Sequence, residues 1–395
     1  MSTKKKQKKV GRINPILYWL VYHILHPLYR IRYGLTVDNK ALRGVKGPVL
    51  VIAPHTSNKD HWLVSMGIYP LRPTFVISEH FMAKPKLRPI LRLAHIITKK
   101  MFCPDVGTIM NILRAKREGN TVVLFPEGRL TCNGRTGRLT DGTATLAKKL
   151  GVDVYVVTAN GASLTFPKWA NKPRRGKIRV VTEKLLSAEE VAALSLDELE
   201  ARLQAAIAHN DFSAMAGVRY RNAAPAEGLD GILYRCPTCG HEFSMKTEGR
   251  RIFCADCDFA AELDEYYRLH GAPFERILDW YDWQIGCTDI HTERLETDAV
   301  IGAVEENGNM NKNAGHARVT MDKETFVFDG EVFGKPVQFT RRTDGITAFP
   351  ITVGEEFDIY HNNVLYYIHP QPDQRAAVKW VAFLDRVTDM AYAEK

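Results

Sequence analysis

The first 35 residues of this chain lack acidic side chains, although the whole sequence of 395 residues has 45 aspartates and glutamates. The same segment carries a cluster of basic residues, namely Lys4, Lys5, Lys6, Lys8, Lys9, Arg12, Arg30 and Arg32. The formal net charge of the chain is +9, so the rest of the sequence is nearly neutral. A basic segment on a nearly neutral body indicates that one end of the chain meets an anionic surface.

The apolar run in this segment is only marginally long enough for a single transmembrane span. The stretch between Pro15 and Pro27 predicts a helix of roughly 12–18 residues, whereas a bilayer core of about 30 Å needs some 20 apolar residues. Trp19 and two tyrosines favour a helix that lies among lipid headgroups. A cleaved signal peptide is disfavoured because residues 30–33 include two arginines where small residues belong. We expect segment 1–35 to attach the protein to the cytoplasmic side of the cell membrane, as a peripheral or monotopic protein. The alternative is a core helix that follows a solvated lysine tail.

Cysteine is scarce, and four of the seven cysteines share a metal-binding spacing. They form two pairs, Cys236/Cys239 and Cys254/Cys257, with two residues inside each pair and fourteen between the pairs. Without an export signal the setting is a reducing cytoplasm, which favours a metal over disulfides. Four thiolates in two tight turns suit tetrahedral Zn²⁺ and leave no open ligand position, so a structural zinc ribbon is predicted over residues 231–262. Acidic residues interrupt its basic ones, so no nucleic-acid partner is expected, although nucleic-acid binding by the ribbon is a further alternative.

No internal repeat is visible, and residues 36–212 alternate short apolar runs with helical stretches. Such alternation predicts an α/β domain with a mostly parallel sheet flanked by helices. The predicted strands are 48–53, 73–77, 121–125, 152–158 and 177–182, and the predicted helices are 58–68, 86–96, 106–118, 141–150 and 195–209.

Residues 213–230 are rich in alanine and predict a linker, and residues 263–395 change to a period of two that predicts strands. A helical spacing precedes these strands at 274–281. The predicted strands are 317–321, 325–328, 332–339, 346–349, 357–360 and 364–368, with turn signals at Asp329-Gly330, Asp344-Gly345 and His361-Asn362-Asn363. An amphipathic helix with Trp380 and Phe383 on its apolar face closes the chain. A β-barrel-like domain capped by one helix resembles the pleckstrin-homology type.

Two short motifs follow two of the predicted strands of the first domain. His55 and Asp60 leave the strand 48–53, and a Phe-Pro-Glu-Gly-Arg turn at residues 125–129 leaves the strand 121–125. An imidazole that titrates near neutrality is suited to remove a hydroxyl proton, and a carboxylate can fix its tautomer. The backbone N–H groups near Thr56 to Asn58, at the start of the next helix, are expected to stabilise an oxyanion. The first motif alone is equally compatible with a solvated loop.

The second motif supplies an anion clamp. Gly128 permits close backbone approach, and Arg129 offers a planar fork for phosphate. Glu127 is a candidate for holding a substrate hydroxyl or bracing the arginine. By itself the motif is also compatible with a strand-end turn that carries a surface Glu–Arg pair. Together the motifs favour acyl transfer onto the hydroxyl of a phosphate-bearing molecule, by direct attack and without a serine or cysteine nucleophile.

Residues from about 49 to 165 resemble the glycerophospholipid acyltransferases, which include the 1-acylglycerol-3-phosphate acyltransferases. His55 and Asp60 match the first block of the family, and residues 125–129 match the third, although Pro54 replaces the usual asparagine. The arginine follows the glycine directly, a variant that resembles the branch acting on lysophosphatidylethanolamine. Where the second block usually has Asp-Arg, this chain has Lys99-Lys100, which keeps positive charge without a bidentate fork.

The resemblance implies an enzyme of phospholipid biosynthesis or remodelling. It would esterify a lysophospholipid, most simply 1-acyl-sn-glycerol-3-phosphate, from acyl-CoA or an acyl carrier protein thioester. His55 and Asp60 would be catalytic, and Glu127, Gly128, Arg129 and Lys100 would bind substrate. A later basic cluster (Lys168, Lys172, Arg174, Arg175, Lys177 and Arg179) is either a headgroup or coenzyme A contact or a solvated loop. The alternative function is a non-catalytic lipid-binding adaptor that uses the ribbon and the β domain for partners.

Overall fold

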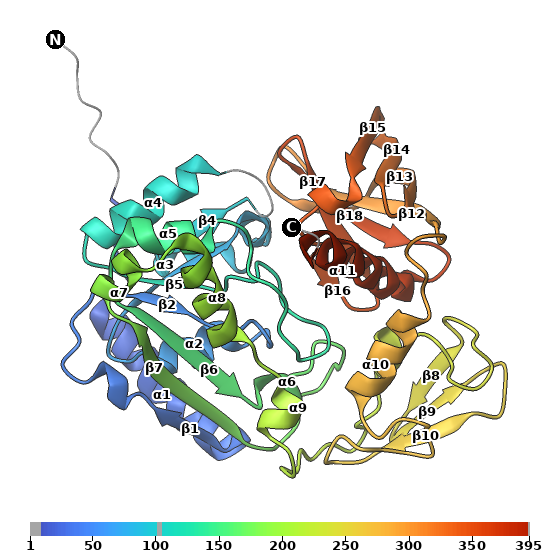
Figure 1. The fold of residues 1–395 in the computed structure, drawn as a ribbon, viewed down its shortest axis with the longest axis horizontal. Coiled ribbons are helices and arrows are strands. Elements are labelled where there is room, and N and C mark those ends of the chain that lie inside the picture. Colours follow the sequence, from blue (N-terminus) through green and yellow to red (C-terminus); the bar gives the residue numbers. More distant parts are fainter. Residues whose placement is uncertain (1–8, 101–104, 394–395) are drawn as a thin grey trace.

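The computed structural model describes residues 9–100 and 105–393, so Lys4, Lys5, Lys6 and Lys8 of the basic segment lie outside the described residues. Three parts follow one another along the chain (Figure 1). We call them the N-terminal domain (residues 9–212), the cysteine module (residues 231–270) and the C-terminal domain (residues 277–393). The fold class predicted for the chain is confirmed: a mostly parallel sheet with helices, a small cysteine-bearing sheet, and a β-rich domain that ends in a helix.

The N-terminal domain is built on a seven-stranded sheet with the order β1-β7-β6-β2-β5-β3-β4. Every neighbouring pair is parallel except β6 and β7. The five predicted strands are all present, and two short ones, β1 and β4, were not predicted. The strands are β1 (Leu35–Asp38), β2 (Leu50–Ile52), β3 (Pro73–Ser78), β4 (Ile97–Lys99), β5 (Thr121–Leu124), β6 (Val154–Asn160) and β7 (Ile178–Leu186).

Helices cover both faces of this sheet because its central strands are apolar on both sides. In β2 the side chain of Val51 enters one core, and those of Leu50 and Ile52 enter the other. The first core is closed by α1 (Pro15–Tyr33) and α2 (Asp60–Gly67), and the second by α4 (Val106–Arg117), α5 (Thr143–Leu150) and α8 (Leu196–Ile207). A sheet buried on both faces is the usual setting of parallel strands, and it leaves the strand ends free for polar residues.

Helix α1 is longer than its flanking prolines predicted. It begins where Asn14 accepts the backbone N–H groups of Ile16 and Leu17, and it runs through Pro27 to a left-handed cap at Gly34. The inner face packs through Tyr18, whose hydroxyl donates to the Ser65 carbonyl at 2.7 Å. The outer face leaves a stripe of apolar side chains exposed: Ile16, Trp19, Leu20, Ile24, Leu28 and Ile31. Among the described residues, no helix has the length and apolar character to cross a bilayer.

The cysteine module contains four antiparallel strands in the order β11-β10-β9-β8. They are β8 (Met245–Glu248), β9 (Arg251–Cys254), β10 (Ala260–Leu263) and β11 (Leu269–His270). Helix α10 (Ile277–Gly286) follows, and its fully buried Trp280 donates its indole N–H to the Arg235 carbonyl at 3.0 Å. In the segment 213–230, predicted as a linker, exposed residues alternate with buried ones such as Tyr220 and Leu229.

The C-terminal domain is a seven-stranded antiparallel sheet in the order β15-β14-β13-β12-β18-β17-β16. Its strands are β12 (Leu295–Val304), β13 (Met310–Met321), β14 (Thr325–Val332), β15 (Lys335–Arg342), β16 (Ile351–Thr352), β17 (Glu356–His361) and β18 (Val364–Pro370). Helix α11 (Ala377–Ala393) packs on the sheet, with the Trp380 ring stacked on Phe357 at 5.2 Å. Strand β12 was not predicted, residues 346–349 form no strand, and the predicted strand 332–339 is interrupted by the turn between β14 and β15.

The predicted turn at Asp329-Gly330 was also wrong, because both residues lie inside β14. A β-carbon on Gly330 would lie 2.2 Å from the His316 carbonyl oxygen on β13, so this glycine permits close strand packing. The turn comes later, at Phe333 and Gly334, which both have positive φ. The turn predicted at residues 361–363 is confirmed between β17 and β18, with positive φ at Asn362 and Asn363.

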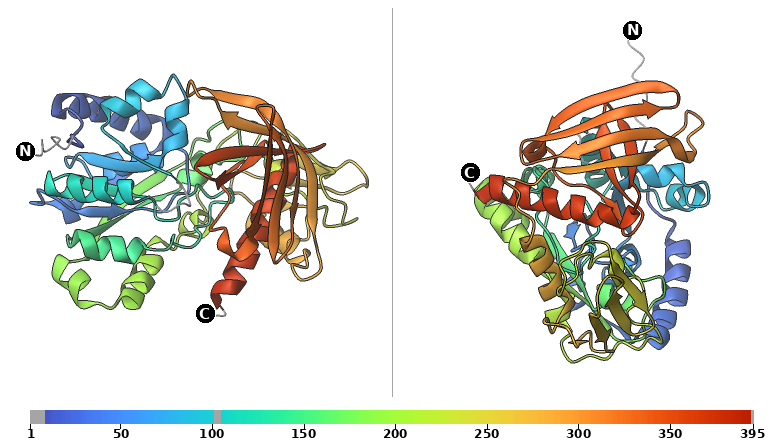
Figure 2. Two further views of the ribbon diagram at one scale, coloured as in Figure 1. Left: turned by 90° about the horizontal axis from the view of Figure 1, so that it is seen from above. Right: turned by 90° about the vertical axis from the view of Figure 1, so that its right-hand side faces the viewer.

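One apolar core joins the three parts. It includes Leu164 and Trp169 of the N-terminal domain, Ile252 of the cysteine module, and Trp280 and Phe357 of the C-terminal domain. In the right-hand view of Figure 2, α11 lies between the C-terminal sheet and the helices of the N-terminal domain. The appended parts are therefore packed against the first domain.

Candidate active site

The two motifs lie side by side at one edge of the N-terminal sheet. Strands β2 and β5 are parallel neighbours, and His55 and Glu127 each follow the end of one of them by three residues. The backbone also links the two loops, because the Thr131 N–H donates to the His55 carbonyl at 3.0 Å. The site is thus placed outside the carboxyl ends of adjacent strands, where parallel sheets commonly bind ligands.

His55 and Asp60 contact each other directly. Nδ1 of His55 lies 3.0 Å from Oδ2 of Asp60, and because the carboxylate only accepts, Nδ1 carries the proton. The lone pair of the neutral ring is then on Nε2, for which the described residues provide no hydrogen-bond partner. The ring stacks on Phe125 with centroids 4.3 Å apart, and its side chain is 26% exposed. This is the arrangement of a general base with a fixed tautomer.

Asp60 is buried at the first turn of α2. Its Oδ2 accepts the backbone N–H groups of Thr56 and Ser57, each at 2.8 Å, in addition to the imidazole. Burial raises the pKa of Asp60, while the bonds from His55 and Ser57 oppose the shift. The N–H groups of Thr56 and Ser57, which the sequence predicted for an oxyanion, are therefore occupied by this carboxylate. These two N–H groups fix Asp60 beside Nδ1 of His55 instead.

Glu127 is a buried link between loops. Its Oε1 accepts the His55 backbone N–H and its Oε2 accepts the Gly137 backbone N–H, both at 2.8 Å. Burial raises the pKa of the carboxyl to about 7, although these two bonds and the nearby Arg129 oppose the shift. The structure thus places Glu127 against the backbone of His55 rather than in an ion pair with Arg129.

Arg129 leaves the same turn in the direction of the C-terminal domain. Gly128, with φ of 71°, makes the turn possible. Nη2 of Arg129 donates to Oδ2 of Asp385 on α11 at 2.6 Å, and Nη1 is buried without a hydrogen-bond partner in the described part of the chain. Burial lowers the pKa of the guanidinium, but Asp385 more than compensates, so the group stays charged. Sequence reasoning missed Asp385, because no local signal links residues 256 positions apart.

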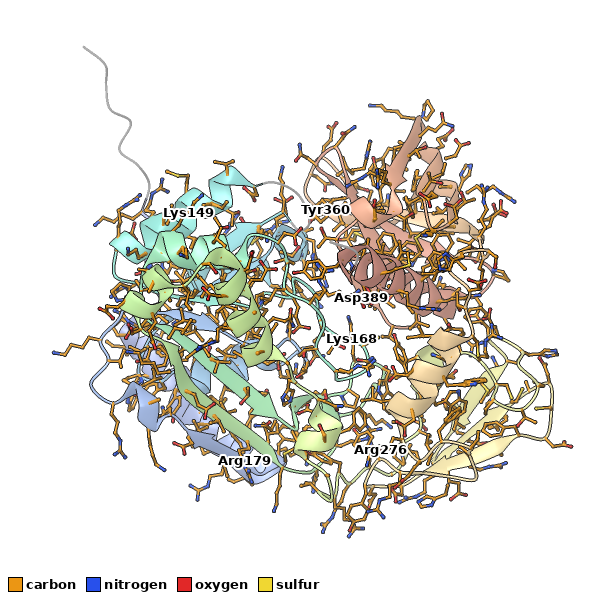
Figure 3. The ribbon with its side chains drawn as sticks, viewed as in Figure 1. Lys149, Lys168, Arg179, Arg276, Tyr360 and Asp389 are labelled. Carbon is orange, nitrogen blue, oxygen red and sulfur yellow. The ribbon has the colours of Figure 1, made fainter. Side chains whose placement is uncertain are left out.

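A cavity of about 770 Å³ lies between the N-terminal and C-terminal domains, beside this turn. Its walls come from the loop 127–141, from α10 and from α11, and they include both Arg129 and Asp385. Glu127 also lines the cavity, and the same side chain accepts a hydrogen bond from the backbone N–H of His55. In Figure 3 the labelled Asp389 of α11, another lining residue, and Lys168 mark the boundary between the two domains.

The other basic residues do not gather on His55. Lys100 follows β4, the edge strand, and its Nζ donates to Asn363 of the C-terminal domain at 3.1 Å. Arg174 is 1% exposed and lies between the rings of Trp169 and Tyr267, so it belongs neither to a solvated loop nor to a headgroup surface. Lys168 donates to the Leu130 carbonyl at 2.9 Å, and burial lowers its pKa to about 8.

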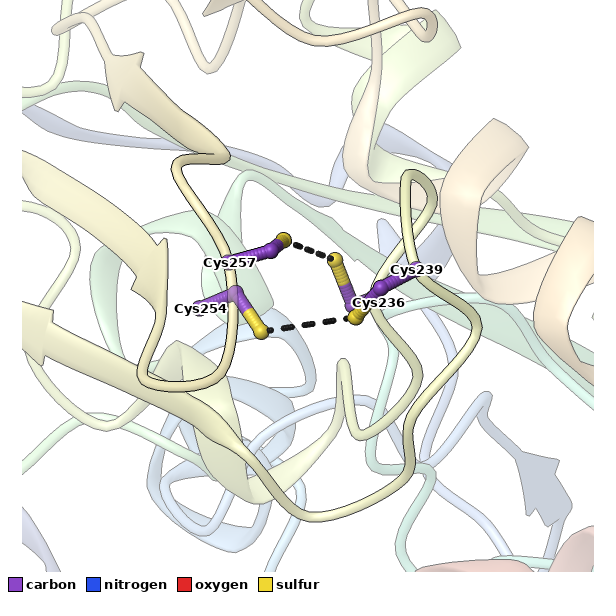
Figure 4. A group of neighbouring side chains, drawn as sticks. All are labelled: Cys236, Cys239, Cys254 and Cys257. Carbon is purple, nitrogen blue, oxygen red and sulfur yellow. Dashed lines mark hydrogen bonds between the residues drawn. The ribbon is translucent and has the colours of Figure 1, made fainter.

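The four paired cysteines converge on one point (Figure 4). The Sγ atoms of Cys236 and Cys257 are 3.7 Å apart, and those of Cys239 and Cys254 are 3.8 Å apart. A disulfide needs about 2.05 Å, whereas four sulfurs at about 2.3 Å from one tetrahedral ion lie about 3.8 Å from each other. Backbone N–H groups of Thr238 and Asp256 also point at two of the sulfurs. These residues could therefore hold a metal ion, and their geometry fits one.

A solved structure and a family model are similar to this chain. The chain is similar to the crystal structure of the 1-acyl-sn-glycerophosphate (LPA) acyltransferase PlsC from Thermotoga maritima, with 17% sequence identity and a TM-score of 0.42. That match covers 48% of this chain and 76% of the other. Residues 34–160, which contain both motifs, match the family model described as Acyltransferase. This match to the family model agrees with the family resemblance that the two motifs predicted.

Proposed function

We propose that the protein transfers an acyl group from a thioester to the free hydroxyl of a lysophospholipid. The observation that carries this proposal is the dyad, in which Asp60 holds Nδ1 of His55 and leaves Nε2 available. The acceptor expected from the sequence is 1-acyl-sn-glycerol-3-phosphate, and the donor is acyl-CoA or an acyl carrier protein thioester. The family match supports the reaction, and the acceptor and donor are part of the proposal.

The reaction needs one base that later acts as an acid. Nε2 of His55 takes the hydroxyl proton while the acceptor oxygen attacks the thioester carbonyl. The imidazolium is stabilised by Asp60, whose carboxylate is already fixed by two backbone N–H groups. When the tetrahedral intermediate collapses, the carbon–sulfur bond breaks and His55 returns the proton to the leaving thiolate. The products are the new ester and a free thiol.

A purified His55→Ala variant tests the proposal. We expect a loss of roughly 10²–10⁴-fold in transfer of a radiolabelled acyl chain, which is the usual contribution of general-base catalysis. His61→Ala is the matched control, because this histidine also lies in the first turn of α2, next to Asp60 in the sequence. We expect this variant to keep near-normal activity. Full transfer by the His55 variant would refute the mechanism. Lipid binding with no transfer from any donor would favour the adaptor instead.

We further propose that the protein works at the cytoplasmic face of the cell membrane. The exposed apolar stripe of α1 supports this location, since the sequence of the first 35 residues contains basic residues and no acidic ones. Such a helix suits the headgroup region of anionic lipid. We also propose that the metal of the cysteine module is structural Zn²⁺, because four sulfurs fill a tetrahedral shell. The seven antiparallel strands and capping helix support a pleckstrin-homology type for the C-terminal domain.

A further inference from the structure

The cavity between the domains is a feature that the general-base mechanism does not use. One wall belongs to the acyltransferase domain and carries Arg129, and the other belongs to α11 and carries Asp385. Two more contacts join the walls. Arg135 forms a bidentate pair with Asp282 of α10, at 2.8 and 2.6 Å, and the guanidinium of Arg138 lies 3.6 Å from the ring centre of Tyr392. The cavity is thus made by both domains and is incomplete without the appended one.

Within the cavity, one of the two terminal nitrogens of Arg129 has a hydrogen-bond acceptor among the described residues, and the other has none. Nη2 is held by Asp385 at 2.6 Å. Nη1 is buried, and no acceptor for it occurs in residues 9–100 or 105–393. Because the guanidinium is planar, fixing Nη2 also fixes the direction of the Nη1–H bonds. A buried donor without a partner is unfavourable, so this position needs an acceptor that the described residues do not supply, and an anion suits a guanidinium best.

We propose that Asp385 is a positioning residue for Arg129, so that the C-terminal domain completes the site at which Arg129, as the sequence already predicted, would bind the phosphate group of a substrate. This inference rests on the proposed function. The phosphate has two chemical sources, the headgroup of the lysophospholipid acceptor and the phosphates of the pantetheine-bearing donor. In either case the appended domain contributes a wall and a carboxylate to the substrate site.

Steady-state kinetics of Asp385→Asn test the proposal, with acceptor and donor varied separately. The asparagine keeps the shape but loses the charge-assisted bond, so the guanidinium is no longer fixed. We expect KM for one phosphate-bearing substrate to rise roughly tenfold with kcat within about twofold, the pattern of lost ground-state binding. The substrate whose KM rises identifies the source of the phosphate. An unchanged KM for both substrates, or a lower one, overturns the proposal, because a lower KM means that Asp385 competes with phosphate.

Two further variants separate positioning from folding. In an Arg129→Ala background, Asp385→Asn is expected to have no further effect on KM, and an equal effect there would show a structural role and overturn the proposal. Glu296→Gln is the matched control, because this carboxylate also accepts a hydrogen bond from a guanidinium of the C-terminal domain, that of Arg318 at 2.6 Å, but lies outside the cavity. Its KM values should match those of the wild type.

Binding measurements keep the inference independent of the reaction. Calorimetric titration with sn-glycerol 3-phosphate and with coenzyme A requires no turnover. We expect one of these probes to bind, and Asp385→Asn and Arg129→Ala to weaken that binding by a similar factor. If neither probe binds, or if neither variant weakens the binding of either probe, the cavity is not a phosphate site, whatever the catalytic activity. If binding behaves as expected but no acyl transfer occurs, the proposed function fails and this site stands.

Discussion

At the scale of single residues, Glu127 makes stability depend on pH. Its pKa is about 7 in the folded protein because it is buried, whereas a glutamate in the unfolded chain titrates near 4.3. The folded state therefore keeps a proton that the unfolded state has released. The stability that this group contributes is complete below about pH 4.3 and is lost as pH rises to about 7.

We therefore expect the free energy of unfolding of the wild type to fall relative to that of Glu127→Gln across this window, by up to about 3 kcal/mol. Denaturant unfolding of both proteins from pH 4.5 to pH 8 measures the difference. Two curves that stay parallel would contradict the shift.

The residue scale also shows what the sequence could and could not predict. His55, Asp60 and the Glu-Gly-Arg turn lie in short motifs, and adjacent parallel strands bring such motifs together at one edge. The positions of these residues were therefore predictable. The partners of Arg129 and Glu127 were not predictable. Asp385 is remote in sequence from Arg129, and Glu127 accepts from the backbone N–H of residue 55, a group that almost any residue type would provide there.

At the scale of elements, α1 has two unlike faces. Its inner face is tied to α2 through Tyr18, and Trp19 and Ile24 on its outer face are both about half exposed. Removing these two side chains should abolish most of the apolar contribution to the free energy of lipid binding, since burying each one fully contributes about 1.5–3 kcal/mol. We expect a Trp19→Ser/Ile24→Ser variant to bind anionic vesicles at least about tenfold more weakly in a sedimentation assay.

The matched control is Leu196→Ser, which removes a similarly exposed apolar side chain from α8. Its vesicle binding should equal that of the wild type. Equal losses in both variants would show that α1 is not the membrane-facing element.

Elements were predicted well wherever their apolar period was regular. In the N-terminal domain all five predicted strands and all five predicted helices are present, with shifts at their ends. Helix α3 (Arg88–Leu93) is the shortest of these, in a proline-broken stretch. The failures have local causes: Pro27 is tolerated inside α1, and Gly330 serves strand packing instead of a turn.

At the scale of the whole molecule, the cysteine module holds α11 in place. Arg375, just before α11, donates to the Met245 carbonyl at 2.6 Å, and Lys379 binds Glu242. Loss of the metal should therefore loosen the module and the wall of the cavity together. We expect Cys254→Ser to lose the zinc that we predict at one ion per chain, and to lower Tm on the order of 10 °C.

Metal analysis and calorimetry of the purified protein measure both effects. Cys287→Ser is the matched control, since this thiol is exposed and stands apart from the four-cysteine cluster. Equal metal content in both variants would refute a four-sulfur site.

The apolar core shared by the three parts has a consequence for biosynthesis. When a ribosome has completed the first 212 residues, the surface around Leu164 and Trp169 has none of its later partners. At about 5–20 residues per second, the rest of the chain takes roughly ten to forty seconds to appear. For that interval the nascent chain exposes an uncovered apolar surface, which we expect to bind chaperones until the carboxyl-terminal half has emerged.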